Sequence, residues 1–553
     1  MAAPGYASVA VHRYQAKLTA VAAAALIVGL ALPAGAHPEG GARQVEFGVD
    51  AARMTSSIAR NALSRVLESA SMSYTRCEGG FAGSYPCLGV DMLSHLPLPS
   101  MGGGEGNDIW GWTDEASGRE FAIVGRSTGT SFVEVTKPTD PVYLGSLPPH
   151  ATSSIWRDIK VYEDHAYIVS EAASSGLQYF DLTELLDVGS PPVTFSESGH
   201  LNGFSNAHNI AVNEETGYAY VIGSSQCSGG LYMVSLADPS SPAFSGCYSA
   251  DGYTHDVQCV VYRGPDTAHA GKELCFASNE DTLTIVDVTD KSSPIQLARR
   301  AYPGASYTHQ GWLTDNHRYF LLDDEADEMF SGVKTTTYIW DVRDVDDPAV
   351  LDTHRSWVNA IDHNQYVADG HTYQANYRAG LRVLSLKGVA GGDLTEVGYF
   401  DVWPADNAAQ FNGAWSVYPF FESGVVVVNG IEQGLFVLFP GAARHAVTTI
   451  DLDDRSRPLP GPHWRARAKI NVVDEDGDPV AGAEVRVRFS NGRDRGCVTD
   501  EAGKCIVKTR IQSRDKVEVR VKGIVDPGSY YTPWTNSDRD GGTNGSVIQL
   551  LRV

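Results

Sequence analysis

Seven copies of one strand pattern occupy the middle of this chain, between about residue 108 and residue 416, and they constrain its fold more than any other feature. Each copy begins with a His or a Trp among small polar residues, passes through two short apolar strands, and reaches a third strand similar to Leu-x-Val-Asp. The copies begin at Asp108-Ile109-Trp110, Ile155-Trp156-Arg157-Asp158, Ala207-His208-Asn209, Thr254-His255-Asp256, Thr308-His309-Gln310, Asp362-His363-Asn364 and Gly413-Ala414-Trp415. A repeat of roughly 50 residues that holds several short strands is typical of a β-propeller blade, so the pattern predicts an all-β fold with seven blades.

The strand signals inside one copy support this interpretation. The third copy predicts strands at 208–212, 218–223, 231–236 and 243–248, with turns between them. Side chains along these strands follow a period of two, and turn residues return about every eight to twelve positions, as antiparallel strands require. We therefore assign residues 90–440 to a seven-bladed propeller, a closed ring that leaves no exposed sheet edge.

The two ends of the chain predict further parts. Residues 1–36 combine a charged start, a short apolar run and a small-residue end, which indicates a secretory signal peptide. Helical spacing of apolar residues from about Asp50 to Ser73 predicts an amphipathic helix within the segment 37–89, which also holds two cysteines. A linker is expected over 441–465, and alternating strands with turns predict a small β-sandwich over 466–553.

The cysteines agree with export. All eight fall into near-neighbour pairs, namely Cys77 with Cys87, Cys227 with Cys247, Cys259 with Cys275, and Cys497 with Cys505. In an oxidising compartment such spacing predicts local disulfides, and a metal-thiolate site is disfavoured because no Cys-x-x-Cys occurs. We expect a secreted or cell-surface protein with no transmembrane segment after signal cleavage. The net charge of −24 argues against nucleic acid as a partner and leaves an extracellular ligand or surface partner of unknown identity.

Several of these motifs also resemble a known family. The LVIVD-like third strands, the Cys77 to Cys87 entry, Asp108-Ile109-Trp110-Gly111-Trp112, Trp156-Arg157-Asp158-Ile159-Lys160-Val161, His208-Asn209 and His255-Asp256 are together similar to the choice-of-anchor B family. Its members are exported bacterial LVIVD-repeat proteins with varying carboxy-terminal surface anchors. The resemblance covers about residues 77 to 440 and implies a seven-bladed propeller at an extracellular or surface location, with no established activity. The chain departs from that pattern at its end, where no sorting tail is recognised, and its Gly477-Asp478-Pro479-Val480 segment resembles bacterial Ig-like or carboxypeptidase-regulatory-like modules.

Four of the seven copies begin at a histidine: His208, His255, His309 and His363. Because each starts an innermost strand, we expect them to meet at one mouth of the central channel. Polar residues that end the second strands should share that mouth, namely Ser170-Glu171, Asn279-Glu280, Asp323-Asp324-Glu325, Asn376-Tyr377 and Asn429. Imidazoles and carboxylates that converge from rigid strands suit zinc, copper or iron, so the sequence predicts a metal site built from the four histidines.

Two other interpretations of this mouth stay open. Each His can instead be a repeat signature that hydrogen-bonds the backbone of a neighbouring blade, and the Trp110 and Trp415 marks at equivalent positions favour such packing. Calcium would use the carboxylate and amide oxygens at the mouth, but imidazole is a poor ligand for calcium, which makes this ion a weaker candidate.

These observations favour two classes of function. The first is a secreted or cell-surface binding protein with a His-rich mouth that holds a metal. The second is a metal-dependent extracellular enzyme, a hydrolase or an oxidoreductase, in which Glu171, Glu280 or Asp324 acts as general base on a bound water. Propellers host many unrelated functions, so the fold does not decide whether the chain is an enzyme.

Overall fold

The computed structural model describes residues 73–512 and 514–552. The predicted signal peptide and, apart from Ser73, the predicted amphipathic helix lie outside the described residues.

Before residue 440, the described chain forms seven sheets that each contain a path of four antiparallel strands. From the first to the last strand of each path, they are β4 (Gly106–Asp114), β5 (Arg119–Arg126), β6 (Gly129–Glu134), β7 (Val142–Leu147); β8 (Arg157–Tyr162), β9 (His165–Ser170), β10 (Leu177–Asp181), β12 (Gly199–Leu201); β13 (Asn209–Asn213), β14 (Tyr218–Ile222), β15 (Leu231–Ser235), β16 (Ala243–Tyr248); β17 (Asp256–Val261), β18 (Glu273–Ser278), β19 (Leu283–Asp287), β20 (Ile295–Arg300); β21 (Thr308–Leu313), β22 (Tyr319–Asp324), β23 (Thr336–Asp341), β24 (Ala349–Arg355); β25 (Asn364–Ala368), β26 (His371–Ala375), β27 (Leu381–Ser385), β28 (Thr395–Phe400); and β29 (Ala414–Tyr418), β30 (Val426–Gly430), β31 (Gly434–Phe439), β3 (Asp91–Leu96). Three short strands extend two of these sheets: β11 (Val193–Thr194) pairs with β7, and β1 (Phe81–Ala82) and β2 (Tyr85–Leu88) extend the sheet at β28. The short helix α3 (Asp327–Ser331) follows β22.

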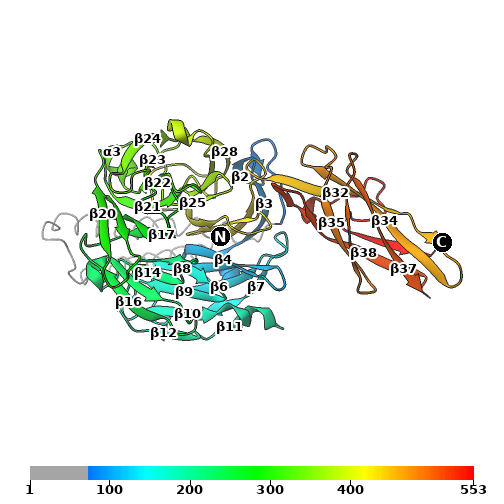
Figure 1. Ribbon diagram of the computed structural model, residues 1–553, viewed down its shortest axis with the longest axis horizontal. Helices are drawn as coiled ribbons and strands as arrows, with labels where there is room; N and C mark the ends of the chain where they lie inside the picture. Colours follow the sequence, from blue (N-terminus) through cyan, green and yellow to red (C-terminus); the bar gives the residue numbers. More distant parts are fainter. Residues whose placement is uncertain (1–72, 513, 553) are drawn as a thin grey trace, which may run out of the picture.

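The first strands of these sheets contact one another in a closed circuit, in the order β4, β8, β13, β17, β21, β25, β29 and back to β4. Figure 1 shows the sheets side by side around a common centre. The two ends of the ring are joined within one sheet. Strand β3, from the beginning of the described chain, pairs with β31 and completes the sheet of β29 to β31. This arrangement is a β-propeller, in which closure removes the open sheet edges.

Burial follows position within each sheet. The third strand β19 is buried at every residue, because neighbouring sheets cover both of its faces, and its sequence Leu-Thr-Ile-Val-Asp is accordingly almost continuously apolar. The outer strand β20 is mostly exposed to solvent, and it carries Arg299 and Arg300. Every predicted strand of the third copy is found within one or two residues of its expected bounds.

The carboxy-terminal part contains two sheets. One joins β33 (Arg457–Pro458), β34 (His463–Asp474), β32 (His445–Asp454), β39 (Ser529–Tyr531) and β37 (Lys504–Gln512); the other joins β36 (Asp494–Val498), β35 (Glu484–Phe489), β38 (Lys516–Val525) and β40 (Val547–Leu551). Both sheets contribute to one hydrophobic cluster around the fully buried Trp464. The segment 441–465, expected to be a linker, instead holds β32 and β33 and the start of β34. The backbone of β32 pairs with β34 in antiparallel register, and this pairing makes the expected linker part of the carboxy-terminal sheet.

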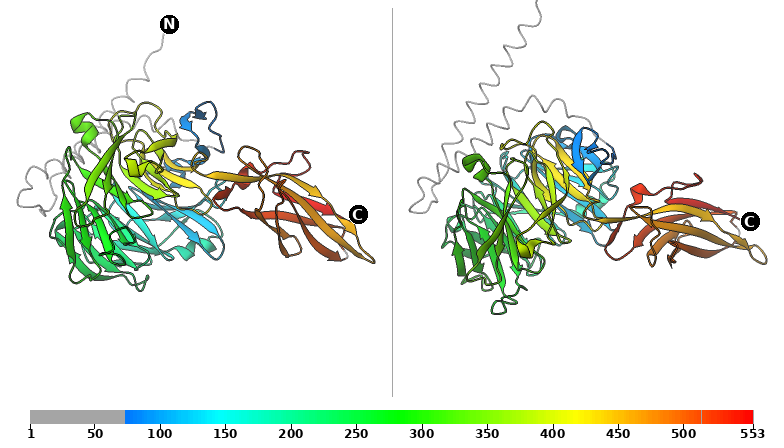
Figure 2. Two further views of the ribbon diagram at one scale, coloured as in Figure 1. Left: turned by 45° about the horizontal axis from the view of Figure 1, so that its top comes forward. Right: turned by 90° about the horizontal axis from the view of Figure 1, so that it is seen from above.

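The two parts are in contact. The Tyr530 hydroxyl donates to Asp369 Oδ2 over 2.5 Å, and the Arg444 guanidinium lies 5.1 Å from the centre of the Tyr530 ring. Phe439, at the end of the propeller, packs edge-on against Trp534. A short turn over residues 440–444 joins β31 to β32, and Figure 2 shows β32 running from the propeller into the second part.

Four disulfides join the same cysteine pairs that sequence spacing predicted, namely Cys77–Cys87, Cys227–Cys247, Cys259–Cys275 and Cys497–Cys505. Cys259 and Cys275 are directly opposite each other on β17 and β18. Multiple disulfides are typical of proteins in oxidising, extracellular environments. Within the described ranges, no helix has the length and apolar character needed to cross a membrane.

Candidate metal centre at the starts of the innermost strands

The four predicted histidines form one continuous row. His208, His255, His309 and His363 each lie at or next to the start of an innermost strand, so four neighbouring sheets place them at the same end of the ring. The centres of adjacent imidazole rings are 4.3, 4.2 and 4.5 Å apart along the row. We refer to these four residues as the histidine row. The four histidines predicted from the repeat therefore lie next to one another at one end of the ring.

Hydrogen bonds from one sheet to the next fix the orientation of three of these rings. His255 Nδ1 lies 3.0 Å from the carbonyl oxygen of His309, His309 Nδ1 lies 2.9 Å from that of His363, and His363 Nδ1 lies 2.5 Å from that of Trp415. A carbonyl oxygen only accepts, so each Nδ1 carries the proton and donates it. In a neutral ring, Nε2 then carries the lone pair that binds metals, and the Nδ1 contact to a carbonyl is the usual support of a metal-binding His.

Burial keeps these rings neutral. It lowers the pKa of His363 to about 3, and it lowers the pKa of His255 and His309 well below the ordinary value, with neighbouring histidines adding to the effect. Desolvation disfavours the charged imidazolium, and a second positive charge nearby would raise that cost. Neutral imidazole is the form that coordinates a transition metal.

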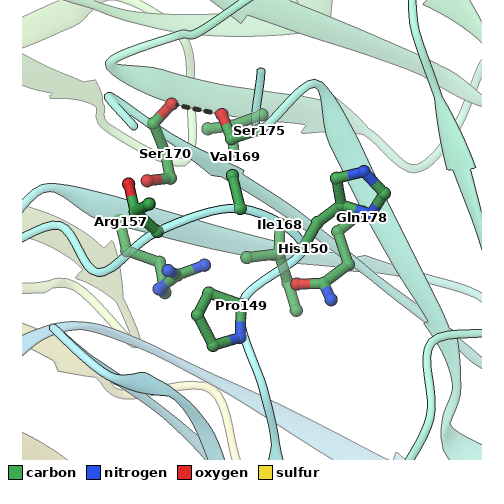
Figure 3. Close-up of a pocket in the computed structure, with 10 residues that line it drawn as sticks. Pro149, His150, Arg157, Ile168, Val169, Ser170, Ser175 and Gln178 are labelled. Carbon is green, nitrogen blue, oxygen red and sulfur yellow. Dashed lines mark hydrogen bonds between the residues drawn. The ribbon is translucent and has the colours of Figure 1, made fainter. Parts of the chain in front are cut away.

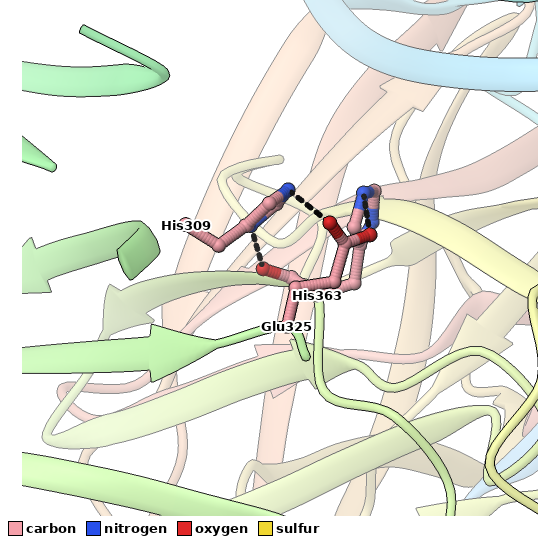
Figure 4. Close-up of side chains that lie close together, drawn as sticks. All are labelled: His309, Glu325 and His363. Carbon is pink, nitrogen blue, oxygen red and sulfur yellow. Dashed lines mark hydrogen bonds and ion pairs between the residues drawn. The ribbon is translucent and has the colours of Figure 1, made fainter. Parts of the chain in front are cut away.

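Glu325 completes a group of three possible ligands with two members of the row. Its carboxylate oxygens lie 3.8 Å from His309 Nε2 and 3.7 Å from His363 Nε2, and one ligand atom from each of the three residues lies within 4.8 Å of the others (Figure 4). All three residues are buried. Glu325 immediately follows β22, and its Oε1 accepts a hydrogen bond of 2.7 Å from the Tyr377 hydroxyl. A buried His309, Glu325 and His363 group has the chemistry to hold a metal ion.

The other two histidines, His208 and His255, lie outside this three-residue group. His208 Nδ1 contacts Glu171 Oε1 at 2.6 Å, forming a separate pair at the far end of the row. The His255 ring lies between those of His208 and His309, tilted toward both, but His255 is not part of the three-residue group. The row therefore does not converge on a single point, because successive sheets are displaced around the ring, and two histidines rather than four share one candidate ion position.

The three acidic residues predicted as general bases occupy distinct environments. Asp324 accepts hydrogen bonds from the Ser306 and Tyr307 amides and from the Tyr302 hydroxyl, an arrangement that holds a loop in place. Glu171 contacts His208, as described above. Glu280 has a left-handed backbone with φ of 61° and bridges to Thr308 through its own amide and carbonyl groups. The Glu171 and Glu280 charges help to raise the pKa of the buried Tyr253 hydroxyl, after the larger effect of burial.

The first two marks of the repeat lie at a different register from the one predicted. Asp108 Oδ2 accepts from the Ile159 amide and Asp158 Oδ2 accepts from the Ile210 amide, which makes Asp108 and Asp158 equivalent. The position of the histidine row is therefore held by the preceding residues, Asn107 and Arg157, instead of Trp110 and Trp156. The sequence could not set this register because Trp and His both begin innermost strands within a few residues of each other.

Trp110 belongs to an aromatic cluster with Trp312, Tyr366 and Phe420. These rings come from different sheets and fill the space between innermost strands beyond Asp108 and Lys160, with the Lys160 ammonium 4.6 Å from the Trp110 ring. Their role is packing, as is usual for aromatic residues at repeat positions.

Sequence reasoning placed Glu325 and Tyr377 among the polar strand ends at the mouth but chose neither as a candidate site residue. The amide of Glu325 donates to the Tyr307 carbonyl as that of Glu171 donates to the Trp156 carbonyl, so Glu325 is the equivalent of Glu171. An alignment of the two repeat copies that matches Glu325 with Glu171 would have selected Glu325 instead of the preceding Asp324.

Comparison with known proteins agrees with the repeat. A family model described as the LVIVD repeat matches residues 205–250 and 270–299, which contain β13 to β16 and β18 to most of β20. The chain is a β-propeller with two stretches that match the LVIVD repeat. No curated protein matches this chain. Among solved structures, the β-propeller domain of Myceliophteria thermophila Cps50 (Swd1) is similar with a TM-score of 0.39 and 10% identity, over 61% of this chain and 97% of that chain.

Proposed function

We propose that this LVIVD-repeat propeller is an exported binding protein that holds one divalent transition metal, with zinc as the best fit, between His309, Glu325 and His363. The proposal rests most on one observation. Two imidazole Nε2 atoms face one carboxylate at 3.7 and 3.8 Å, and both sides of each contact are hydrogen-bond acceptors when the rings are neutral.

A metal ion between these atoms would bond to both the imidazole nitrogens and the carboxylate oxygens. Zinc bonds to imidazole nitrogen and carboxylate oxygen at about 2.0–2.2 Å, so one ion can bridge atoms up to roughly 4.2 Å apart. The separations of 3.7 and 3.8 Å fall inside that limit, whereas they are too long for direct hydrogen bonds. Copper and iron share these ligand types, and the buried nitrogen ligands argue against calcium.

Other features of the chain support the proposed fold and location of the protein. The closed circuit of innermost strands supports a propeller with seven blades, and the two carboxy-terminal sheets with a shared core support an Ig-like sandwich that serves as a spacer or adhesion module. The disulfides and the signal-like start support secretion or display at a cell surface, where the partner is an extracellular ligand.

Metal analysis of the purified full chain tests the proposal. We expect about one zinc ion per chain after equilibration with zinc and removal of the excess, measured by elemental analysis. Competition with a chromophoric chelator should show that His309→Ala weakens zinc binding by more than about 100-fold, because it removes a direct ligand.

His208→Ala is the matched control. His208 belongs to the same row and is also buried, but it contacts Glu171 and lies outside the three-residue group. Its loss should change zinc affinity by no more than a few fold. A parent chain without stoichiometric metal, or equal affinities in the His309→Ala and His208→Ala variants, contradicts the proposed site.

A metal-dependent enzyme is the second candidate function. Three protein ligands leave coordination positions for water or substrate, which is the composition of catalytic rather than structural zinc sites. Of the predicted bases, Glu171 contacts a member of the row, His208, at 2.6 Å. Hydrolysis of activated esters by the zinc-loaded chain, abolished in His309→Ala and lowered in Glu171→Gln with zinc still bound, would favour this alternative over a binding role.

A further inference from the structure

Arg157 is a buried cation at the position that the histidine row occupies in the next four sheets. It begins β8, directly before Asp158, and only 3% of its surface is exposed. Its Nε donates to the Arg126 carbonyl oxygen over 3.2 Å, while its buried Nη2 has no hydrogen-bond partner in the described part of the protein. A buried polar atom without a partner carries a substantial free-energy cost, and for a charged group the cost is larger.

The surroundings of Arg157 do not supply a negative charge. The adjacent buried Arg126 donates only to neutral groups, namely the Ser131, Thr128 and Ser146 hydroxyls and the Gly103 carbonyl. Within the described residues, neither guanidinium has a carboxylate oxygen within 4.0 Å. Burial and then the Arg126 charge lower the pKa of Arg157 to about 10, so the group is still cationic at neutral pH. Buried charges are ordinarily paired, and here two cations lie together.

A pocket opens beside the Arg157 side chain. It is lined on one side by the loop of Pro149 to Thr152 and on the other by Ile168, Val169 and Ser170 at the end of β9 (Figure 3). The pocket contains about 190 Å³ of space that protein atoms do not fill, part of it open to solvent, and its interior has room for a guest of about the size of one water molecule. Typical small-molecule sites are larger, at about 300–1,000 Å³.

We propose that Arg157 and this pocket bind a small inorganic anion, and chloride, which is monatomic and singly charged, is the candidate that we name. The anion neutralises the Arg157 guanidinium and receives the hydrogen bonds that no protein group accepts. Glu197, which contacts two residues that line the pocket, already accepts from His150 Nδ1 and Gln178 Nε2 and makes no ion pair with Arg157 among the described residues. The site is separate from the proposed metal group, so its failure would leave that proposal intact.

Thermal unfolding of the full chain in two salts tests the proposal. The midpoint is measured in sodium chloride and in sodium gluconate at equal ionic strength, because gluconate is too large for the pocket. We expect a saturable rise of roughly 2–4 °C in chloride over gluconate, since a ligand that binds only the folded state stabilises it by mass action. Arg157→Gln, which removes the charge and keeps an N–H donor, should abolish the difference between the salts.

Arg263→Gln is the matched control, because Arg263 is exposed and pairs with Glu215. It should retain the chloride effect of the parent chain. If Arg157→Gln does not fold, crystals of the parent chain grown in bromide decide the question through the anomalous signal of that ion. A bromide peak within hydrogen-bond distance of the Arg157 guanidinium supports the site. Equal midpoints in both salts, or a pocket that holds water without bromide, overturn it.

Discussion

His309 Nδ1 donates a 2.9 Å hydrogen bond to the backbone carbonyl oxygen of His363, and this contact has two consequences. It ties the sheet that begins with β21 to the sheet that begins with β25. It also fixes the tautomer that leaves the His309 Nε2 lone pair facing Glu325. The two interpretations of the repeated histidines, a lock between blades and a metal ligand, are therefore compatible in the same side chain.

The Tyr377 hydroxyl should tune metal affinity without touching the metal. It donates to Glu325 Oε1 over 2.7 Å and orients that carboxylate. Tyr377→Phe keeps the ring and removes the donor, so we expect zinc affinity to fall roughly 10- to 100-fold, as for other groups that support a metal ligand. Chelator competition measures the change. Tyr366→Phe, in the aromatic cluster with Trp110, is the control and should leave the affinity unaltered; an equal effect of both variants would assign the loss to general destabilisation.

His255 should contribute more to stability than to metal binding. It is buried, and its Nδ1 donates to the His309 carbonyl oxygen in the next sheet. His255→Ala leaves a cavity and a carbonyl without its donor, and we expect a loss of about 2–4 kcal/mol in the free energy of unfolding. Guanidinium unfolding followed by tryptophan fluorescence provides the measurement. The exposed His445, paired with Glu475, is the comparison, and His445→Ala should cost less than about 1 kcal/mol.

Stability should fall as the pH rises through the titration of Asp401. Burial raises the pKa of this carboxyl to about 6, above the value of about 3.9 expected in the unfolded chain. Between these values the folded state keeps a proton that the unfolded state has released, so the contribution present at pH 4 is lost by about pH 6–7 and amounts to at most roughly 3 kcal/mol.

Asp401→Asn should flatten that part of the profile. The amide oxygen can still accept from the Trp403 backbone, and the variant has no proton to lose. We expect it to be more stable than the parent chain above about pH 6, by about 1–3 kcal/mol, in denaturant unfolding at a series of pH values. The exposed Asp140→Asn should reproduce the parent profile, and a parallel profile for Asp401→Asn would show that this carboxyl does not titrate as described.

Arg444 should hold the carboxy-terminal part against the propeller. Its guanidinium lies between the Tyr373 and Tyr530 rings and donates to the Pro419 carbonyl oxygen. Arg444→Ala removes these contacts, and we expect a larger radius of gyration in solution scattering and faster proteolysis just after Phe439. Arg455→Ala, whose partner is the nearby Asp453 within the same part, is the control. Unchanged scattering in both variants would place the contact elsewhere, for example at Phe439 and Trp534.

The repeat was readable because each copy has the same local requirements. The third strands such as Leu283–Asp287 are covered on both faces, so their apolar runs stand out, and the turns between strands use Asp-Pro or Ser-Pro pairs. The cysteine pairs could also be predicted from the sequence, since partners such as Cys259 and Cys275 are on adjacent strands and therefore close in sequence. The linker prediction failed over β32 because this segment becomes a strand by pairing with β34, and the local sequence does not reveal that partner.

By itself, the sequence determined that histidines begin four neighbouring innermost strands and that acidic residues end the strands beside them, because strand period and turn chemistry are local. Only the tertiary structure decided which of these meet. The angle between successive sheets separates His208 and Glu171 from His309 and His363, while the turn after β22 brings Glu325, and not Asp324, to face the two Nε2 atoms. Differences of one residue in register and of a few ångströms around a ring depend on packing between distant segments, which no local pattern encodes.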